Sequence, residues 1–426
     1  MNSISKTIKC VVLSLFLFSG YSQALFGQEE SVDLVKVTNT RAVKDSSDSK
    51  EFVELSGEAV SSLEEKTSTH VLAKPWFRNM DISGFSEVRF QDSGDDGTQP
   101  NAGFVVKHAS LFLEAEAWED FSVFLEFSVA SSVRVNEVYV HFRNVLKKWG
   151  DDILGIKVGR IDIPFGEEYL WNDSPSNLLI SHTAAYPWLW DEGIALYGTL
   201  GGFGWITSLT DGTLARSSED DPGKAVTAKV YGSPWTPLYL SASFMRNGKT
   251  SKGALLLGGS FFQPVGTQDA SSLGASPSDK VDAALYQIDA KYSFREKAAL
   301  EFALGKAFIN DAVDSFDRDL TWFSVQPHYN LTRNLYAILR YSEIGTYDTN
   351  EGYHLGGEFL AGGNKAFGYD AKRLQRFSVG LGWRPNPRAM VKLEIGRDRF
   401  KVIDASLFDP GDDDRVFYAS EIVLSF

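Results

Sequence analysis

Apolar and polar residues alternate in short segments from Trp76 to the end of the chain. Within the segment 104–117, Leu111, Leu113, Ala115 and Ala117 alternate with Phe112, Glu114 and Glu116, and residues 121–129 repeat this period of two. Successive side chains of a strand point to opposite faces, so the pattern predicts strands with one apolar face. Segments of about ten such residues, separated by turns, are typical of a transmembrane β-barrel. The sequence therefore predicts an all-β antiparallel barrel over residues 76–426.

The connections between these segments alternate in length, which predicts a barrel with two different ends. The apolar segment from Ala254 to Gln263 is assigned to a long connection, because counting it as a strand would break the alternation. The predicted total is then about sixteen strands, with eighteen as the alternative. Short turns are expected at residues 118–120, 144–152, 201–202, 233–237, 294–297, 331–333 and 385–388. Long connections are expected at residues 162–191, 211–224, 247–280, 310–319, 345–372 and 402–415.

The last segment, Val416 to Phe426, alternates and ends on an aromatic residue. A terminal amphipathic strand that ends on an aromatic side chain resembles the assembly signal of outer-membrane barrels. The alternative is an ordinary last strand.

The first 75 residues differ from the barrel segment. Lys6 and Lys9 precede an apolar run from Cys10 to Gly20, and small residues at Ser22 and Ala24 follow. This order predicts a secretory signal peptide over residues 1–24. Residues 25–75 are polar and poor in aromatics, which predicts a linker or a weak helix in the periplasm. A cell-wall or partner-binding arm is the alternative for this segment.

Composition narrows the function further. The chain has 30 Phe, 16 Tyr and 37 Gly, as expected for many strands and tight turns. Its formal net charge of -14 disfavours nucleic acid as a partner. Cys10 is the one cysteine and lies in the signal peptide, so no disulfide is expected in the exported chain. The sequence contains no nucleotide loop, no zinc spacing and no G-x-S-x-G motif, and we expect neither a cofactor nor an enzyme.

The stretch from Leu154 to Tyr197 carries a more specific resemblance. Lys157 to Arg160 runs into Pro164 to Glu167, and the segment from Asp191 to Gly198 follows. With these motifs, residues 76–426 resemble the phosphate-selective porin O and P family. The resemblance implies a sixteen-stranded porin of the bacterial outer membrane, often trimeric, whose third outer loop folds inward and narrows the channel. Its implied partners are membrane lipid, lipopolysaccharide and small hydrophilic solutes or inorganic anions such as phosphate.

Charged residues on the expected inner face are candidates for the pore lining. A narrow pore that passes anions needs ordered cationic groups, whereas acids beside them would make a mixed polar wall. The sequence shows no uninterrupted Arg/Lys ladder, and Glu167 and Glu168 would favour cations if they faced the pore. Candidates for the lining and constriction are Lys157, Arg160, Asp162, Glu167, Glu168, Lys229, Lys291, Arg340, Arg376 and Lys392. Acids expected on the same face are Glu114, Glu116, Glu126, Glu137, Asp289, Glu301, Glu394 and Glu421.

Two further features leave alternatives open. The aromatics Trp171, Tyr186, Trp188 and Trp190 could shape the constriction or belong to an interfacial aromatic girdle. His108 and Ser110 share a strand face, as a base and a nucleophile of a lipolytic barrel would. A lipolytic barrel and an envelope-tethering barrel are thus the alternatives to a passive porin.

Overall fold

A computed structural model describes most of the chain from Phe77 to the C-terminus. The described ranges are residues 77–92, 101–130, 133–150, 152–172, 175–185, 190–212, 223–250, 281–311, 318–345, 371–402 and 414–426. The predicted signal peptide, the polar segment 25–75 and the segment Ala254 to Gln263 lie outside these residues and stay predictions.

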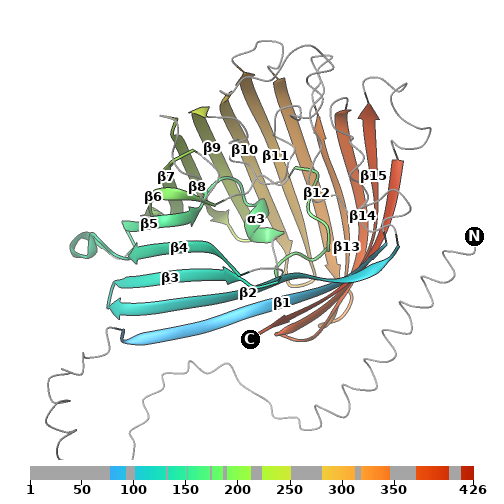
Figure 1. Cartoon of the computed structure of the whole chain (residues 1–426), viewed down its shortest axis with the longest axis horizontal. Coiled ribbons are helices and arrows are strands. Elements are labelled where there is room, and N and C mark those ends of the chain that lie inside the picture. The colour runs from blue at the N-terminus through green and yellow to red at the C-terminus, as the bar shows by residue number, and fades with distance from the viewer. Residues whose placement is uncertain are drawn as a thin grey trace, which may run out of the picture. The chain divides into compact units, whose positions relative to one another are not determined.

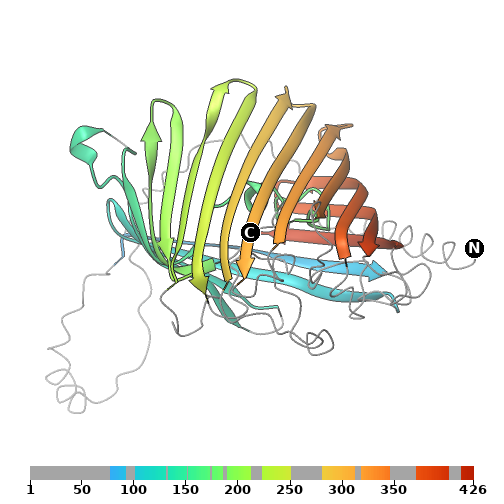
Figure 2. The ribbon, with the colours of Figure 1, turned by 90° about the horizontal axis from the view of Figure 1, so that it is seen from above.

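Sixteen strands form one closed antiparallel barrel, which confirms the predicted fold class and strand number (Figure 1). Each strand pairs with its neighbours in sequence, so the colours of Figure 2 advance gradually from strand to strand. The first eight are β1 (Asn79–Asp92), β2 (Gly103–Trp118), β3 (Phe121–Ser128), β4 (Arg134–Phe142), β5 (Gly155–Asp162), β6 (Trp190–Leu200), β7 (Phe203–Thr210) and β8 (Ala225–Trp235). The others are β9 (Leu238–Thr250), β10 (Val281–Phe294), β11 (Ala298–Asp311), β12 (Arg318–Asn330), β13 (Leu335–Gly345), β14 (Ala371–Asn386), β15 (Ala389–Val402) and β16 (Asp414–Ser425).

The two terminal strands close the barrel. Phe85 of β1 lies opposite Ser425 of β16, and the backbone of Gly84 exchanges two hydrogen bonds with Phe426. A Cβ atom on Gly84 would lie 2.7 Å from the Phe426 ring, so the closure needs a residue without a side chain here. The aromatic end of the chain is therefore part of the seam between the first and last strands.

The two ends of the barrel differ as predicted. Short turns follow the even-numbered strands from β2 to β14, for instance at residues 201–202 and 387–388, except that the connection after β4 is longer. The odd-numbered strands from β5 to β15 are followed by longer connections, including residues 211–224 between β7 and β8. We call the two ends the short-turn end and the long-connection end.

The two faces of the wall also differ. Residues such as Ile288, Leu304 and Ile395 face outward and expose roughly half of their surface, whereas their strand neighbours facing inward are polar or small. Near the short-turn end, Trp118 and Phe142 both pack against Phe121, at ring-centroid distances of 4.9 and 5.0 Å. An apolar outer band bordered by aromatics is the expected surface of a barrel in a bilayer.

Charged pairs occupy the outward face at the other end of the same wall. Each pair joins the two strands of one hairpin close to its long connection. Because the pairs lie beyond the apolar residues along the strands, we call them the outer charge belt. The belt consists of Arg160–Glu192, Arg246–Asp282, Lys306–Asp319, Arg373–Glu343 and Arg397–Asp414.

Helices are short in the described part of the chain. A 3-10 turn, η1 (Lys147–Trp149), lies in the connection after β4, and α3 (Glu168–Trp171) lies in the connection after β5. Among the described residues, no helix is long and apolar enough to cross a membrane.

Candidate functional site

The connection between β5 and β6 runs along the inner face of the barrel instead of projecting from its end. We call its described residues, 163–172 and 175–185, the inner loop; Figure 1 shows α3 between the walls of the barrel. Ile163 and Phe165 are almost fully buried where the loop begins. Gly166 has a φ of +69°, and a Cβ there would lie 2.5 Å from the Gln287 side chain. The Pro-Phe-Gly sequence therefore supplies the glycine that this sharp turn against β10 requires.

The start of the inner loop is fixed to β8 and β9. Lys229 of β8 donates to the Gly166 carbonyl oxygen at 3.1 Å and forms an ion pair with Glu167 at 3.3 Å. Tyr239 of β9 donates its phenolic hydrogen to Glu167 at 2.8 Å, and the Gly166 amide donates to Ser243 Oγ at 3.0 Å. These contacts hold the loop against the wall through one charge pair and several hydrogen bonds.

Arg340 of β13 is the centre of the next group of contacts, and its side chain is fully buried. Its guanidinium donates to the Ser181 carbonyl oxygen and to the side-chain oxygens of Asn172, Asn177 and Gln326. Four acceptors from two parts of the loop and from β12 thus meet one planar donor. Arg suits this position because its five N–H groups point in fixed directions.

Four successive carbonyl groups of the inner loop each accept a hydrogen bond from a cation of a different strand. Leu179 O accepts from Lys392 of β15, Ile180 O from Arg89 of β1, Ser181 O from Arg340 of β13, and His182 O from Arg376 of β14. We call residues 179–182 the carbonyl row. A buried carbonyl is costly without a partner, so the cations satisfy a segment that forms no regular backbone pairing of its own.

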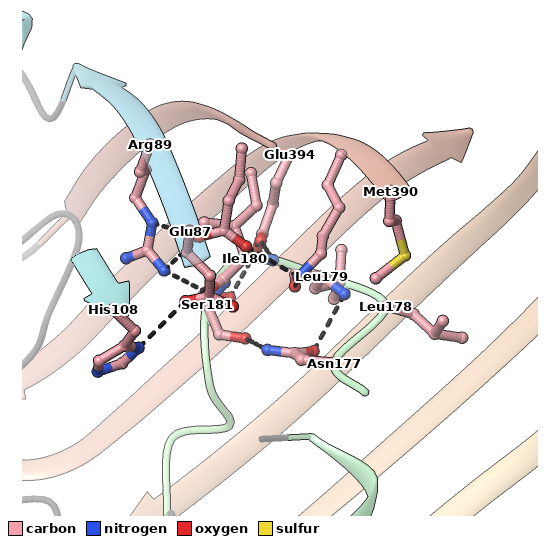
Figure 3. Close-up of polar contacts among 12 residues, drawn as sticks. Glu87, Arg89, His108, Asn177, Leu178, Leu179, Ile180, Ser181, Met390 and Glu394 are labelled. Carbon is pink, nitrogen blue, oxygen red and sulfur yellow. Dashed lines mark hydrogen bonds and ion pairs between the residues drawn. The ribbon is translucent and has the colours of Figure 1, made fainter. Parts of the chain in front are cut away.

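One carboxylate satisfies the amides of the same segment. Glu394 of β15 accepts from the backbone amides of Ile180 and Ser181 and from the Ser181 hydroxyl (Figure 3). The Ala184 amide donates to Ser342 Oγ at 2.8 Å. Hydrogen bonds to a charged group are stronger than neutral ones, so Glu394 is a strong acceptor for this part of the loop.

The cations that hold the carbonyl row also have carboxylate partners. Arg376 pairs with both oxygens of Asp398 at 2.7 Å. Arg89 and Lys392 share Glu421, at 2.7 and 2.8 Å. These side chains are at most 7% exposed. Their charges are therefore balanced locally and covered by the loop, and they do not form an open ladder of anion-binding cations.

The inner wall from β2 to β6 is organised differently, because it carries a row of aromatic rings. Consecutive centroids are 6.2 Å apart for Phe112 and Phe124, 5.0 Å for Phe124 and Tyr139, and 6.2 Å for Tyr139 and His141. His141 lies 5.6 Å from Tyr197 and shares a hydrogen bond with it. These residues alternate with the outward-facing apolar ones, so the rings face the interior; we call them the aromatic row.

Two of the predicted lining residues, Lys157 and Lys291, form no hydrogen bond or ion pair with the described residues of the inner loop. Lys157 faces inward, with its ammonium 4.6 Å from the Tyr139 ring centroid. Lys291 pairs with Glu301 at 2.7 Å and lies 5.4 Å from the Trp171 ring centroid. Asp162 ends β5, and its amide donates to Glu137 at 2.9 Å. Their partners are wall residues or loop aromatics.

Arg160 lies on the opposite face of β5 from the one expected. It shares the outward face with Val158 and pairs with Glu192 in the outer charge belt. The expectation placed Arg160 in the pore with Lys157, but they are three positions apart, and a period of two puts residues an odd number apart on opposite faces. The parity rule itself therefore assigns Arg160 to the outside.

Glu168 is buried in α3 and accepts a hydrogen bond from Asn172 at 2.9 Å. Its burial raises the pKa of its carboxyl to about 7, although the Arg340 charge lowers it. The wall acids expected to face inward bind wall or loop donors: Arg143 pairs with Glu114 and Glu116, Gln287 donates to Asp289, and Ser110 donates to Glu126. A mixed wall of acids and bases is the result.

The two residues considered for lipolysis contact different carboxylates. Ser110 donates to Glu126 Oε1 at 3.1 Å, and His108 Nδ1 lies 3.1 Å from Glu87 Oε2. In Figure 3, His108 points toward Glu87 of β1. A base that activates a serine must accept the hydroxyl proton, and here the Ser110 hydroxyl donates to a carboxylate instead.

The sequence motifs that predicted the inner loop did not reveal which residues bind it to the wall. Asn172, Asn177 and Ser181 lie in an irregular stretch without periodicity, so their roles could not be read from a pattern. Arg89 was detectable, because it alternates with Phe85 and Glu87 on the inner face of β1. Of the four aromatics left open, Trp171 lies inside, 6.0 Å from the Tyr239 ring, and Trp190 begins β6. Tyr186 and Trp188 lie outside the described residues.

No protein-family model matches the chain, and no curated protein sequence matches it. Solved structures do resemble it. In-vitro folded OmpT, an outer membrane protein of Vibrio cholerae, has a TM-score of 0.57 at 9% identity, over 82% of this chain and 97% of that one. An anion-selective porin from Comamonas acidovorans has a TM-score of 0.53 at 12% identity, over 82% and 99%. The outer membrane channel DcaP of Acinetobacter baumannii has a TM-score of 0.53 at 14% identity, over 82% and 97%. At such low identities these likenesses establish the fold, which this chain shares with bacterial outer-membrane porins and channels.

Proposed function

We propose that this protein is an outer-membrane porin through which small hydrophilic solutes diffuse passively. The observation that carries the proposal is the inner loop, which crosses the interior of a sixteen-stranded barrel and is bonded to the wall through the carbonyl row. A segment held in this way reduces the open cross-section and leaves a narrowed aqueous path. Export by the predicted signal peptide and contact with lipid and lipopolysaccharide belong to the same proposal.

The charge arrangement supports weak ionic selectivity over a phosphate-specific filter. Arg340, Arg376 and Lys392 are the cations that a phosphate filter would use, but they bind loop carbonyls and wall acids. A filter for a bare anion needs donors that can replace its hydration shell, and donors already bound to carbonyls are not free to do so. Phosphate would then pass as one small anion among others.

A homotrimer is part of the proposal. One structure of Vibrio cholerae OmpT with the same fold is described as a trimer form. Chemical cross-linking of the protein in native membranes would test this assembly, with a ladder ending at three copies as the expected result.

Planar-bilayer recording tests the channel directly. Purified, folded protein should insert and conduct in potassium chloride, and the reversal potential in a salt gradient should lie close to zero. Protein that inserts and folds but never conducts would overturn the proposal. A strong anion reversal potential, with phosphate conducted in preference to chloride, would instead restore the hypothesis of a phosphate-specific channel.

A further inference from the structure

A second feature of the interior lies beneath the inner loop, toward the short-turn end of β10 to β14. It is a cavity of about 410 Å³, within the size range of small-molecule sites. Leu170 and Trp171 of α3 contribute to one side, and Lys291, His328 and Arg384 contribute to the opposite wall. The cavity belongs to the solute path if the protein is a channel, so any role for it in solute passage rests on the proposed function.

The charges around this cavity leave one cation in excess. Three basic side chains, Lys291, Arg295 and Arg384, and two carboxylates, Glu296 and Glu301, line it, giving a difference of one positive charge with His neutral. Lys291 is bound to Glu301 at 2.7 Å. Among the described residues, no carboxylate lies within ion-pair distance of Arg384, which is exposed to the interior.

Arg384 lies beside an aromatic ring that is itself bonded to the inner loop. Its guanidinium carbon lies 4.8 Å from the centroid of the Tyr336 ring. The Tyr336 hydroxyl donates to Leu178 O at 2.9 Å, so this ring is fixed against the inner loop. An arginine in this position has N–H groups that can bind a carboxylate through two parallel hydrogen bonds.

The opposite side of the cavity is apolar. Leu170 exposes 52% of its surface although it lies inside the barrel. Trp171 beside it has the Lys291 ammonium 5.4 Å from its ring centroid. An exposed large apolar side chain in a polar interior is informative, because it offers a surface that water does not favour. The cavity thus combines an exposed guanidinium with an apolar wall.

We propose that this cavity is a binding site for small aromatic carboxylates, with the carboxylate on Arg384 and the ring against Leu170 and Trp171. A solute bound here lies in the narrowed path just past the inner loop. Binding concentrates such solutes in the channel and slows their exit, so they occupy the pore longer than a chloride or acetate ion does. The channel as a whole has only weak ionic selectivity, and this site makes it favour aromatic carboxylates among the anions.

Bilayer recordings with benzoate and acetate test this proposal. In potassium chloride with added benzoate, we expect concentration-dependent interruptions of the current that acetate does not produce. Arg384→Gln should weaken the apparent benzoate affinity about tenfold, as the loss of a charge-assisted hydrogen bond does. Leu170→Ser should weaken benzoate binding and leave the acetate response unchanged. Saturation-transfer NMR of benzoate with the detergent-solubilised barrel measures binding without current.

Arg388→Gln is the matched control, because Arg388 is an exposed arginine in the turn that ends the same strand and is not part of the cavity lining. Its benzoate response should equal that of the unmodified protein. Equal interruptions by benzoate and acetate, or equal effects of Arg384→Gln and Arg388→Gln, would overturn the site. Conduction of potassium chloride in these same recordings keeps the porin proposal standing in that case, whereas a barrel that binds benzoate in NMR but never conducts would refute the porin and retain the site.

Discussion

The inner wall formed by β13 to β16 with β1 and the inner wall formed by β2 to β6 contain similar charged residues but use them differently. On the first wall, Arg340 and its neighbours are buried and bind the carbonyl row. On the second, Arg143 is 36% exposed and pairs with acids of its own wall, and Lys157 lies over a ring of the aromatic row. A basic residue on the inner face of a barrel therefore says little about ion selectivity until the segment that covers it is known.

The largest expected effect comes from removing the centre of the first wall. Arg340→Ala would leave the Ser181 carbonyl and the side chains of Asn172 and Asn177 without their shared donor. Leaving a buried acceptor without its donor costs about 1–3 kcal/mol per group. We expect the inner loop to leave the wall, with a larger and noisier single-channel conductance in planar bilayers.

Arg143→Ala removes a cation from the second wall and is the control for that comparison. It should change the conductance little, because Arg143 contacts Glu114 and Glu116 and not the inner loop. If the two substitutions altered the current equally, the distinction between the two walls would be wrong.

Glu394→Gln should have an intermediate effect. The substitution keeps the shape of the side chain but removes the negative charge of the carboxylate that accepts hydrogen bonds from the Ile180 and Ser181 amides. Hydrogen bonds to charged groups contribute about 1.5–3 kcal/mol each, and a neutral amide retains part of this. Amide hydrogen exchange at Ile180 and Ser181 should become faster, while exchange in β3 stays unchanged. Unchanged exchange at both amides would mean that neighbouring contacts hold the carbonyl row alone.

A pH effect sharpens the comparison at the start of the loop. The pKa of Glu168 is raised from 4.5 to about 7 in the folded protein, so the folded state favours the protonated carboxyl. The stabilisation that the protonated Glu168 carboxyl gives the folded protein is fully present below pH 4.5, the pKa of the group in the unfolded chain. It is lost as pH rises through about 7, the pKa in the folded protein. We expect more frequent current fluctuations above this pH than below it. Glu168→Gln should remove the dependence, and a dependence that persists in the variant would assign it to another group.

The smallest effect is expected on the second wall. Phe124→Leu removes one ring between Phe112 and Tyr139, which should cost about 0.5–1.5 kcal/mol beyond the lost area. A slightly lower thermal unfolding temperature with an unchanged conductance would agree with a wall that is independent of the inner loop. A change in loop docking, seen as faster exchange at Ser181, would show that the two walls are coupled.

The sequence was sufficient for the barrel because strand alternation is a local property. The period of two, the alternating connection lengths and the terminal segment 416–426 each follow from neighbouring residues. The Pro-Phe-Gly turn at Gly166 was detectable for the same reason, since its chemistry is confined to a few positions.

The contacts of the inner loop were beyond the sequence because they join distant parts of the chain. Ser181 and Arg340, for example, are separated by 159 residues. Glu167 and Glu168, which were candidates for the pore lining, are buried. Neither alternation nor spacing reports on a segment that lies flat against the wall. Whether a charged side chain on the inner face is accessible to solute depends on whether a distant segment of the chain covers it, and a local sequence pattern does not report this.

The outer charge belt has a consequence for how the barrel sits in its membrane. Its five ion pairs lie on the outward face of five separate hairpins, from Arg160–Glu192 around to Arg397–Asp414. Moving a basic side chain from the interface to the bilayer midplane costs about 2–4 kcal/mol. Sinking the barrel would draw all five pairs toward hydrocarbon together, and raising it would expose the apolar band below them to water. The belt and the aromatics at the short-turn end thus fix the immersion depth, and with it the level at which the inner loop meets the solution outside.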